Sequence, residues 1–189
     1  GGRRDRAQLL ACPVRPMPTT RGLGVASVPI GTPQDGYAWR FRLLCAHVLD
    51  AGATGAGKGS AICSLQRGLA ERIADRSVQV WAIDPKGGME LRPGQRLFCR
   101  FEDSSAEAMC AAVEDLVRLK DKRAKALAGR GLRIHTASSD EPQFVLIIDE
   151  LATLTALADR TVTNRFERAL GLLLTQGRAC GITVVAAVQ

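Results

Sequence analysis

The sequence predicts an α/β protein in which a mostly parallel sheet is covered by helices on both faces. The 189 residues suffice for one domain with a sizeable core. Apolar runs of strand length recur along the chain, and segments with helical periodicity separate them. Right-handed crossovers between such strands produce a three-layer sandwich. The expected strands of this sheet are Ala46–Ala51, Val78–Ile83, Phe144–Asp149 and Ile182–Val188.

The chain divides into a basic lead-in and a folded core. Residues 1–36 contain five prolines and several turn pairs, so we interpret them as irregular, with one short strand near Val25–Ile30. The alternation in Tyr37–Leu44 predicts an antiparallel edge strand. We assign residues 37–189 to the core. Because the chain stops directly after an apolar strand, we expect the core to be truncated at its C-terminus.

Three helices are expected between the strands. The first begins at Lys58, and the third spans Val162–Gln176. Ser104 and Glu107 have the spacing of a capping box for the second, long helix. The stretch Ala128–Pro142 is rich in Gly, Ser, Asp and Thr and predicts a mobile surface loop. The apolar residues of the first two helices form single stripes, made of Ile62, Leu65, Leu69 and Ile73 in the first and Met109, Val113, Leu116 and Val117 in the second.

Composition excludes several classes of protein. Hydrophobic residues at 46% and charged residues at 24% are close to globular averages, which excludes disordered, collagen-like and coiled-coil chains. The six cysteines have no Cys-x-x-Cys spacing, so buried reduced thiols in a cytosolic protein explain them better than zinc or disulfides. No apolar run approaches the ~18 residues of a membrane span. We therefore expect a cytoplasmic domain.

The net charge of +7 is concentrated in two blocks. One extends from Arg3 to Arg42, and the other from Glu114 to Arg133. Such an excess suggests a polyanionic partner, although blocks of this kind more often form ordinary solvated faces. Charge alone does not identify the partner.

The segment after the first strand predicts a loop that binds phosphate. Its glycines allow positive φ and close approach, so successive N–H groups can surround the β-phosphate of a nucleotide. The following helix N-terminus adds partial positive charge, and the lysine can reach the β- and γ-phosphates. ATP is therefore the expected ligand. The residues of this loop are Gly52, Ala53, Thr54, Gly55, Ala56, Gly57 and Lys58.

The next two residues depart from the usual form of this loop. Ser or Thr normally follows the lysine and binds Mg²⁺ through its hydroxyl, but Gly59 stands there. Ser60 comes ~100° farther around a helix and replaces that hydroxyl only if the first turn adjusts. Magnesium otherwise depends on phosphates, waters and a carboxylate. We count Gly59 and Ser60 with the nucleotide-binding residues, and Ser60 also with the metal ligands.

Two acids at the end of a buried strand predict the other half of an ATPase site. Four apolar residues lead directly to Asp149 and Glu150. Beside a phosphate loop, Asp149 is suited to the magnesium shell and Glu150 to polarising the attacking water. The reaction expected from these residues is ATP hydrolysis.

Further candidates follow or precede other strands. Gln189 ends the last strand at the edge that carries Gly52 and Asp149, where its amide could sense the γ-phosphate. Arg178 precedes that strand and is either a solvated arginine after a helix, the more common case, or a candidate for completing the site of a neighbouring subunit. Asp84–Gly88 follows the second strand and either contacts nucleotide or a neighbour, or forms a tight turn. Asp50, inside the first strand, would be costly if buried without a partner.

Taken in order, these segments resemble the FtsK/SpoIIIE family of motor ATPases, which have a RecA-like P-loop core. The resemblance covers roughly residues 37–189 and is closest to actinobacterial plasmid-transfer members, whose phosphate loop looks like the one here. The segments that support it are Gly52–Ser60, Asp84–Gly88, Asp149 and Glu150, Gly177–Ile182 and Gln189.

The resemblance implies a function that the residues alone do not. Members of the family form hexameric rings on double-stranded DNA and move it by hydrolysing ATP bound at subunit boundaries. Lys58, Glu150, Gln189 and Arg178 are then the catalytic candidates, with ATP and Mg²⁺ as cofactors. The full-length protein would act at the cytoplasmic face of the cell membrane, anchored by segments outside this chain, in plasmid or mobile-element transfer or in chromosome segregation.

Two alternatives remain open. Relatives in specialised secretion move proteins, so the cargo could be protein rather than DNA. The departure at Gly59 could also leave a structural subunit that binds nucleotide without turnover. ATP hydrolysis and its response to DNA distinguish these alternatives.

Overall fold

The structure is a computed structural model that describes residues 28–31, 39–41, 46–52 and 58–188. Within these residues, five strands pair in parallel in the order β3-β7-β6-β4-β5. The predicted α/β class with a mostly parallel sheet is confirmed, and the four expected strands are present. The strands are β3 (Val48–Ala51), β4 (Val78–Ile83), β5 (Phe98–Glu102), β6 (Gln143–Ile148) and β7 (Ile182–Val188).

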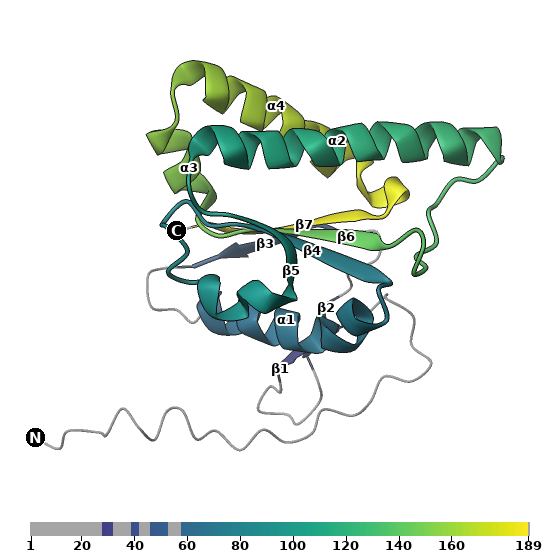
Figure 1. Cartoon of the computed structure of the whole chain (residues 1–189), viewed down its shortest axis with the longest axis horizontal. Helices are drawn as coiled ribbons and strands as arrows, with labels where there is room; N and C mark the ends of the chain where they lie inside the picture. Colours follow the sequence, from purple (N-terminus) through teal and green to yellow (C-terminus); the bar gives the residue numbers. More distant parts are fainter. Residues whose placement is uncertain (1–27, 32–38, 42–45, 53–57, 189) are drawn as a thin grey trace, which may run out of the picture.

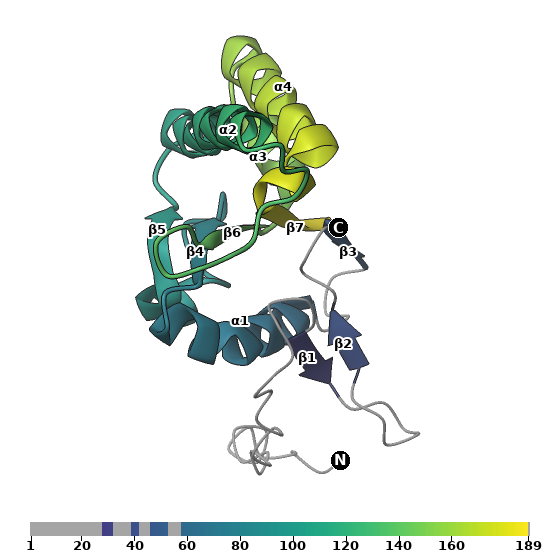
Figure 2. The ribbon, with the colours of Figure 1, turned by 90° about the vertical axis from the view of Figure 1, so that its right-hand side faces the viewer.

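Helices cover both faces of the sheet and make the three layers that were expected. Figures 1 and 2 show α1 below the sheet, with α2, α3 and α4 above it. The first, second and third predicted helices correspond to α1, α2 and α4, whereas the short α3 was not predicted. The helices are α1 (Lys58–Ala74), α2 (Ala106–Gly129), α3 (Leu151–Leu157) and α4 (Arg160–Gln176).

The central strand β6 shows why the predicted strands appear in the sequence as continuous apolar runs. Successive strand residues point to opposite faces, so a strand covered on both sides has no solvent-facing position. Leu146 and Ile148 pack with the apolar faces of α2 and α4, whereas Val145 and Ile147 pack with α1. All six residues of β6 are buried. This strand therefore joins the two halves of the core.

A second, two-stranded sheet lies beside α1. Its strands, β1 (Val28–Gly31) and β2 (Trp39–Phe41), pair in antiparallel fashion. Val28 is buried in the cluster that contains Leu65 and Leu69 of α1. The antiparallel strand predicted within residues 37–44 is thus present, but it pairs with β1 rather than with the main sheet.

The connection between β4 and β5 packs against α1. It contains the 3₁₀ helix η2 (Arg92–Leu97). Leu91 is buried with α1 residues, and a side chain at Gly94 would overlap Gln66 of α1. Gly88 adopts φ +84°, which turns the chain before η2. This connection is therefore fixed beside the first turns of α1.

Two expectations about α2 and the loop after it were wrong in detail. The N-cap is Ser105, whose hydroxyl accepts a hydrogen bond from the Ala108 N–H, rather than Ser104. The helix also continues to Gly129, which shortens the predicted loop. The loop lies at the surface, as expected, and one point of it is attached to the residues before β7, because the backbone N–H of the buried His135 donates to Ala179 O at 2.8 Å.

The described cysteines divide into two buried and two exposed thiols. Cys110 and Cys180 are buried, as expected, but Cys63 and Cys99 are exposed. All four are free thiols.

No helix in the described ranges is both long and apolar enough to span a membrane.

The close contact between Gly181 and His135 generates a stability prediction. Gly181 has φ +72°, and a Cβ at this position would overlap the His135 ring. We expect Gly181→Ala to lower the free energy of unfolding by ~1–3 kcal/mol, through backbone strain and overpacking. Urea denaturation followed by circular dichroism measures the change.

Gly171→Ala is the matched control for this change. Gly171 lies inside α4, with open space where its Cβ would be. Alanine should therefore raise the free energy of unfolding by ~0.5–1 kcal/mol. Equal effects of the two substitutions would contradict this description of the Gly181 turn.

Candidate nucleotide-binding site

Parallel pairing brings the ends of four strands to one edge of the sheet. The register aligns Ala51 with Val188 and Ile148 with both Ala186 and Ile83. The residues that follow these strands continue the alignment, since Gly52 N donates to Val188 O at 3.3 Å and Asp149 N donates to Ile83 O at 2.9 Å. The start of the predicted phosphate loop and the acidic pair therefore lie at the same edge.

The order of the strands sets the distance between Gly52 and Asp149. Strand β7 separates β3 from β6, so Gly52 and Asp149 are two strand spacings apart, or ~10 Å. Figure 1 shows this edge on the left, on the side of α3.

The described part of the phosphate loop is its two ends. Gly52 follows β3, and Lys58, Gly59 and Ser60 are the first three residues of α1. Lys58 therefore opens the helix, as predicted, and only its backbone is described. Gln189 lies outside the described residues, as do the loop residues Ala53, Thr54, Gly55, Ala56 and Gly57.

The Asp84 carboxylate organises the turn that follows β4. Its Oδ1 accepts a hydrogen bond from Lys86 N at 3.0 Å, and its Oδ2 accepts from Glu90 N and Leu91 N at 3.3 Å. Asp84 is completely buried, and these bonds offset the cost of burying its charge. Of the two roles considered for this residue, the structure supports the tight turn.

Asp149 is buried without a comparable set of partners. It is 8% exposed, and its Oδ2 has no hydrogen-bond partner among the residues that the structure places. Burial and, to a smaller extent, the nearby Asp84 carboxylate raise the pKa of Asp149 to about 6, with Glu90 and Glu150 contributing and Lys86 opposing. An unpaired buried carboxylate oxygen is costly, and a cation would compensate it.

Glu150 is held at the same edge in an unusual backbone conformation. Its φ of 55° and ψ of 72° lie in the left-handed region, at the residue that caps α3. Such a conformation costs ~1–3 kcal/mol in a non-glycine residue and is enriched at functional sites, although Arg76, in the turn after α1, also has a positive φ. Lys86 Nζ lies 3.4 Å from Glu150 Oε2. Lys86, predicted only as a possible nucleotide or subunit contact, thus lies beside the candidate water-activating carboxylate.

The donor set at this edge fits magnesium bound together with a nucleotide. Across the residues described, no group of three or more His, Cys, Asp or Glu side chains forms a ready-made metal cage. Magnesium usually keeps several waters and binds one or two carboxylates plus phosphate oxygens. The unpaired Oδ2 of Asp149 provides one such carboxylate. Ser60 is exposed in a helix that is regular from Lys58, so the local adjustment required for its metal role is not seen.

Arg178 lies at the opposite edge of the sheet. It is exposed in η3 (Arg178–Cys180), before the first residue of β7. The seven residues of β7 span ~20 Å, so Arg178 cannot reach the site of its own chain. Its role in the site of a neighbouring subunit stays a prediction.

Two polar side chains near β3 have different environments. His47 Nδ1 accepts a hydrogen bond from Val184 N at 3.0 Å, which ties the chain before β3 to β7. Burial lowers the pKa of His47, and Arg178 lowers it further. Asp50 Oδ2 is buried with no hydrogen-bond partner among the described residues, and nothing in that part of the chain explains it.

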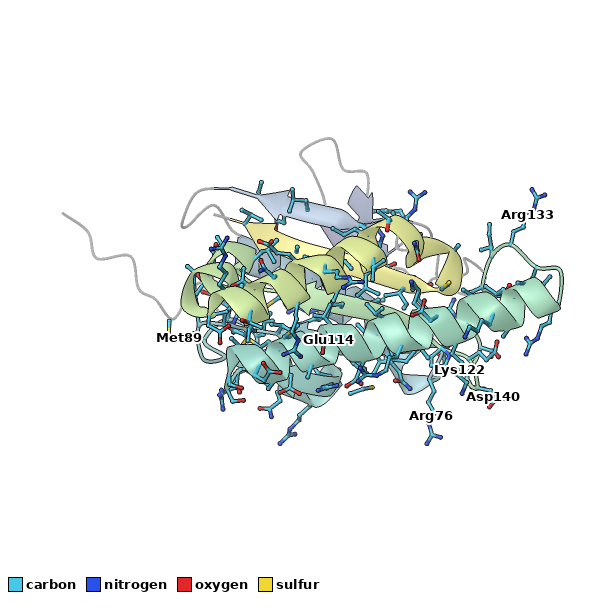
Figure 3. All side chains as sticks on the ribbon, turned by 90° about the horizontal axis from the view of Figure 1, so that it is seen from above. Arg76, Met89, Glu114, Lys122, Arg133 and Asp140 are labelled. Carbon is cyan, nitrogen blue, oxygen red and sulfur yellow. The ribbon has the colours of Figure 1, made fainter. Side chains whose placement is uncertain are left out.

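Part of the basic block on α2 is structural. Arg123 donates hydrogen bonds to Pro142 O and Cys180 O, and the buried Lys120 donates to Gln176 Oε1 at 2.7 Å. Lys122 and Arg133 instead extend outward from α2 and from the loop after it (Figure 3). The formal charge of this block is therefore larger than the positive charge that a bound polyanion could contact.

The sheet order, the helical layers and the placement of the phosphate loop define the three-layer core of the P-loop ATPases. The same fold occurs in the pCW3 conjugation coupling protein TcpA, solved with ATPγS, at a TM-score of 0.68 and 24% identity. That alignment covers 86% of this chain and 47% of the TcpA chain. The chain matches the FtsK/SpoIIIE family over residues 15–137, and it belongs to that family.

The relatives of this chain include a DNA translocase and a transfer protein. The chain is 32% identical to the DNA translocase SftA of Bacillus subtilis over 155 residues, which are 76% of this chain and 16% of SftA. It is 29% identical to the transfer protein TraSA of Streptomyces ambofaciens over 183 residues, which are 88% of this chain and 43% of TraSA. The chain thus spans less than half the length of either relative.

The raised pKa of Asp149 predicts a specific pH dependence of stability. A folded-state pKa above the unfolded value means that the folded protein holds the proton more tightly. The stability from this group is therefore complete below pH ~4 and is lost as the pH rises through about 6. In the nucleotide-free protein, Asp149→Asn should raise the free energy of unfolding by ~1–3 kcal/mol at pH 7.5 and have little effect at pH 4.

Asp140→Asn is the control for the charge change. Asp140 is exposed in the loop after α2 (Figure 3). Urea unfolding of both variants at the two pH values measures the difference. The raised pKa of Asp149 would be contradicted if Asp149→Asn destabilised the protein at pH 7.5. It would also be contradicted if Asp140→Asn gave the same dependence of stability on pH.

Proposed function

We propose that this chain is the ATP-hydrolysing module of a translocase that moves double-stranded DNA. The observation that supports the proposal most strongly is the buried Asp149–Glu150 pair at the sheet edge where the phosphate loop begins. Asp149 has an unpaired carboxylate oxygen and a neighbouring glutamate beside the ends of the phosphate loop, and this combination is typical of a catalytic site. Membership of the FtsK/SpoIIIE family and the names of the relatives direct the proposal toward DNA.

Each part of the site has a role in this proposal. The amides of the loop from Gly52 and the Lys58 amino group bind the phosphates of ATP, and Asp149 binds the shell of Mg²⁺. That ion, when bound, neutralises charge on the phosphates. Glu150 accepts a proton from the attacking water, and Lys86 keeps its carboxylate at the site edge. Gln189 senses the γ-phosphate at the end of β7.

Arg178 bears on the oligomeric arrangement that we propose. Because it is exposed at the far edge from its own site, any part that it takes in hydrolysis is in the site of another subunit. A homo-oligomeric ring, hexameric as in the family, would place nucleotide at subunit boundaries and DNA in the centre. In the full-length protein we expect this ring at the cytoplasmic face of the membrane, in plasmid or mobile-element transfer or in chromosome segregation.

The proposed role of Glu150 predicts a loss of turnover without a loss of binding. Glu150→Gln removes the proton acceptor and should lower kcat for ATP hydrolysis by ~10²–10⁴-fold. The Kd for ATP should stay within a fewfold of the wild-type value. Phosphate release in the presence of Mg²⁺ measures the rate, and fluorescence titration with mant-ATP measures binding.

Glu71→Gln is a matched control because Glu71 is exposed on α1, far along the helix from the phosphate loop. Its kcat should equal that of the wild type. A wild-type protein that binds ATP without hydrolysing it, with or without DNA, would favour the structural subunit that binds nucleotide without turnover.

DNA as cargo predicts a response to DNA that depends on salt. Double-stranded DNA should raise the ATPase rate, and its binding constant should fall linearly with salt on a logarithmic scale, because bound cations leave the phosphates. Measurements at several salt concentrations test this. A protein that hydrolyses ATP but neither binds nor responds to double-stranded DNA at moderate salt would be better explained as a secretion ATPase.

A further inference from the structure

Glycine at residue 59 removes the side chain that the phosphate loop normally directs at magnesium, and another side chain occupies the space beside it. A Cβ added at Gly59 would lie 3.0 Å from Glu90 Oε2. The Glu90 carboxylate therefore reaches the first turn of α1 from the connection between β4 and η2. The position that lacks a hydroxyl thus has a carboxylate oxygen next to it.

The backbone of Glu90 is fixed on both sides. Its N–H donates to Asp84 Oδ2 at 3.3 Å, and Asp84 is itself completely buried at the end of β4. The next residue, Leu91, is 2% exposed and packs among residues of α1. The backbone of Glu90 is therefore held at a distance from which its exposed side chain reaches Gly59.

Two further observations indicate that a cation belongs at this place. Asp149, at the end of β6, is more than nine-tenths buried, and its Oδ2 has no hydrogen-bond partner in the described structure. Glu90 and Asp149 are held at adjacent residues at the end of β4, since Asp149 N donates to Ile83 O at 2.9 Å and Glu90 N donates to Asp84 Oδ2 at 3.3 Å. Magnesium prefers carboxylate and phosphate oxygens.

We propose that the Glu90 carboxylate provides the oxygen that the loop lacks at Gly59 and binds the magnesium ion of the nucleotide together with Asp149. The proposal rests on the proposed function, because the ion arrives with ATP. It accounts for the retention of a metal-dependent site despite the glycine. It also replaces Ser60 as the metal ligand, since regular helical geometry turns Ser60 ~100° away from Gly59.

The affinity for Mn²⁺ tests the proposal without relying on turnover. The protein is saturated with mant-ATP in EDTA-treated buffer, and Mn²⁺ is then titrated and followed by electron paramagnetic resonance. Glu90→Gln should raise the Kd for Mn²⁺ by about 10–100-fold, as is usual when a group that supports a metal is lost. The Kd for mant-ATP without metal should stay within about twofold of the wild-type value, because the phosphate loop is unchanged.

Three variants make the test specific. Glu71→Gln removes an exposed acid from α1 away from the loop and should leave the Kd for Mn²⁺ unchanged. Glu90→Ala should weaken Mn²⁺ binding as Glu90→Gln does. Adding Gly59→Ser to Glu90→Ala places a hydroxyl in the vacated space and should restore most of the affinity. Thermal unfolding checks that each variant is folded.

Several results would overturn the proposal. One is a wild-type Kd for Mn²⁺ in Glu90→Gln, and another is a loss of Mn²⁺ affinity in Ser60→Ala instead. The third is a Kd for mant-ATP that Glu90→Gln raises equally in the presence and in the absence of metal. That result would mean that Glu90 acts on the phosphate loop. A wild-type chain that binds no mant-ATP would overturn the proposed function itself, whereas the first three results leave it intact.

Discussion

The unpaired carboxylate of Asp149 is the constraint on which the functional interpretation depends. A buried charge without partners destabilises the folded protein unless a ligand compensates it. Asp84, one strand away, shows the opposite solution, since three backbone N–H groups satisfy its buried carboxylate. The fold thus uses two similar acids differently. Asp84 fixes the chain, and Asp149 is left with an oxygen available for a ligand.

The parallel sheet makes this arrangement possible. Strands that run in the same direction end at the same edge, so residues far apart in the sequence meet there without long loops. The turn at Asp84 then directs Glu90 toward α1, while Lys86 lies beside Glu150. Acidic and basic groups that follow the neighbouring strands β4 and β6 therefore meet at one edge of the sheet. The packing of the core sets the positions of these residues.

Much of the fold could be predicted because strands that are buried on both faces of the sheet appear in the sequence as continuous apolar runs. The runs Val78–Ile83 and Ile182–Val188 have few or no exposed residues and became β4 and β7 with the predicted bounds. Strand β5 was missed because it lies at the edge of the sheet, where Arg100 and Cys99 interrupt the apolar run. The short helix α3 was missed because the stretch after Glu150 was interpreted as a linker.

The candidate site was predictable only where the chemistry is local in sequence. The glycines of the phosphate loop and the pair Asp149 and Glu150 form short sequence motifs, which can be recognised without a structure. The positions of Lys86 and Glu90 depend on strand order and on the packing of η2 against α1, which no spacing rule gives. Arg178 was predicted to act in a neighbouring subunit, and the direction of β7 agrees with this, because it places Arg178 at the far edge from the site of its own chain.

A crystal structure with a non-hydrolysable ATP analogue and Mn²⁺, located by its anomalous scattering, tests the central claim most directly. The account predicts that the β-phosphate is bound by amides of residues 53–57 and that the metal lies beside Asp149 Oδ2 at the edge between β3 and β6. A nucleotide bound elsewhere, or a metal far from both Asp149 and Glu150, would contradict it.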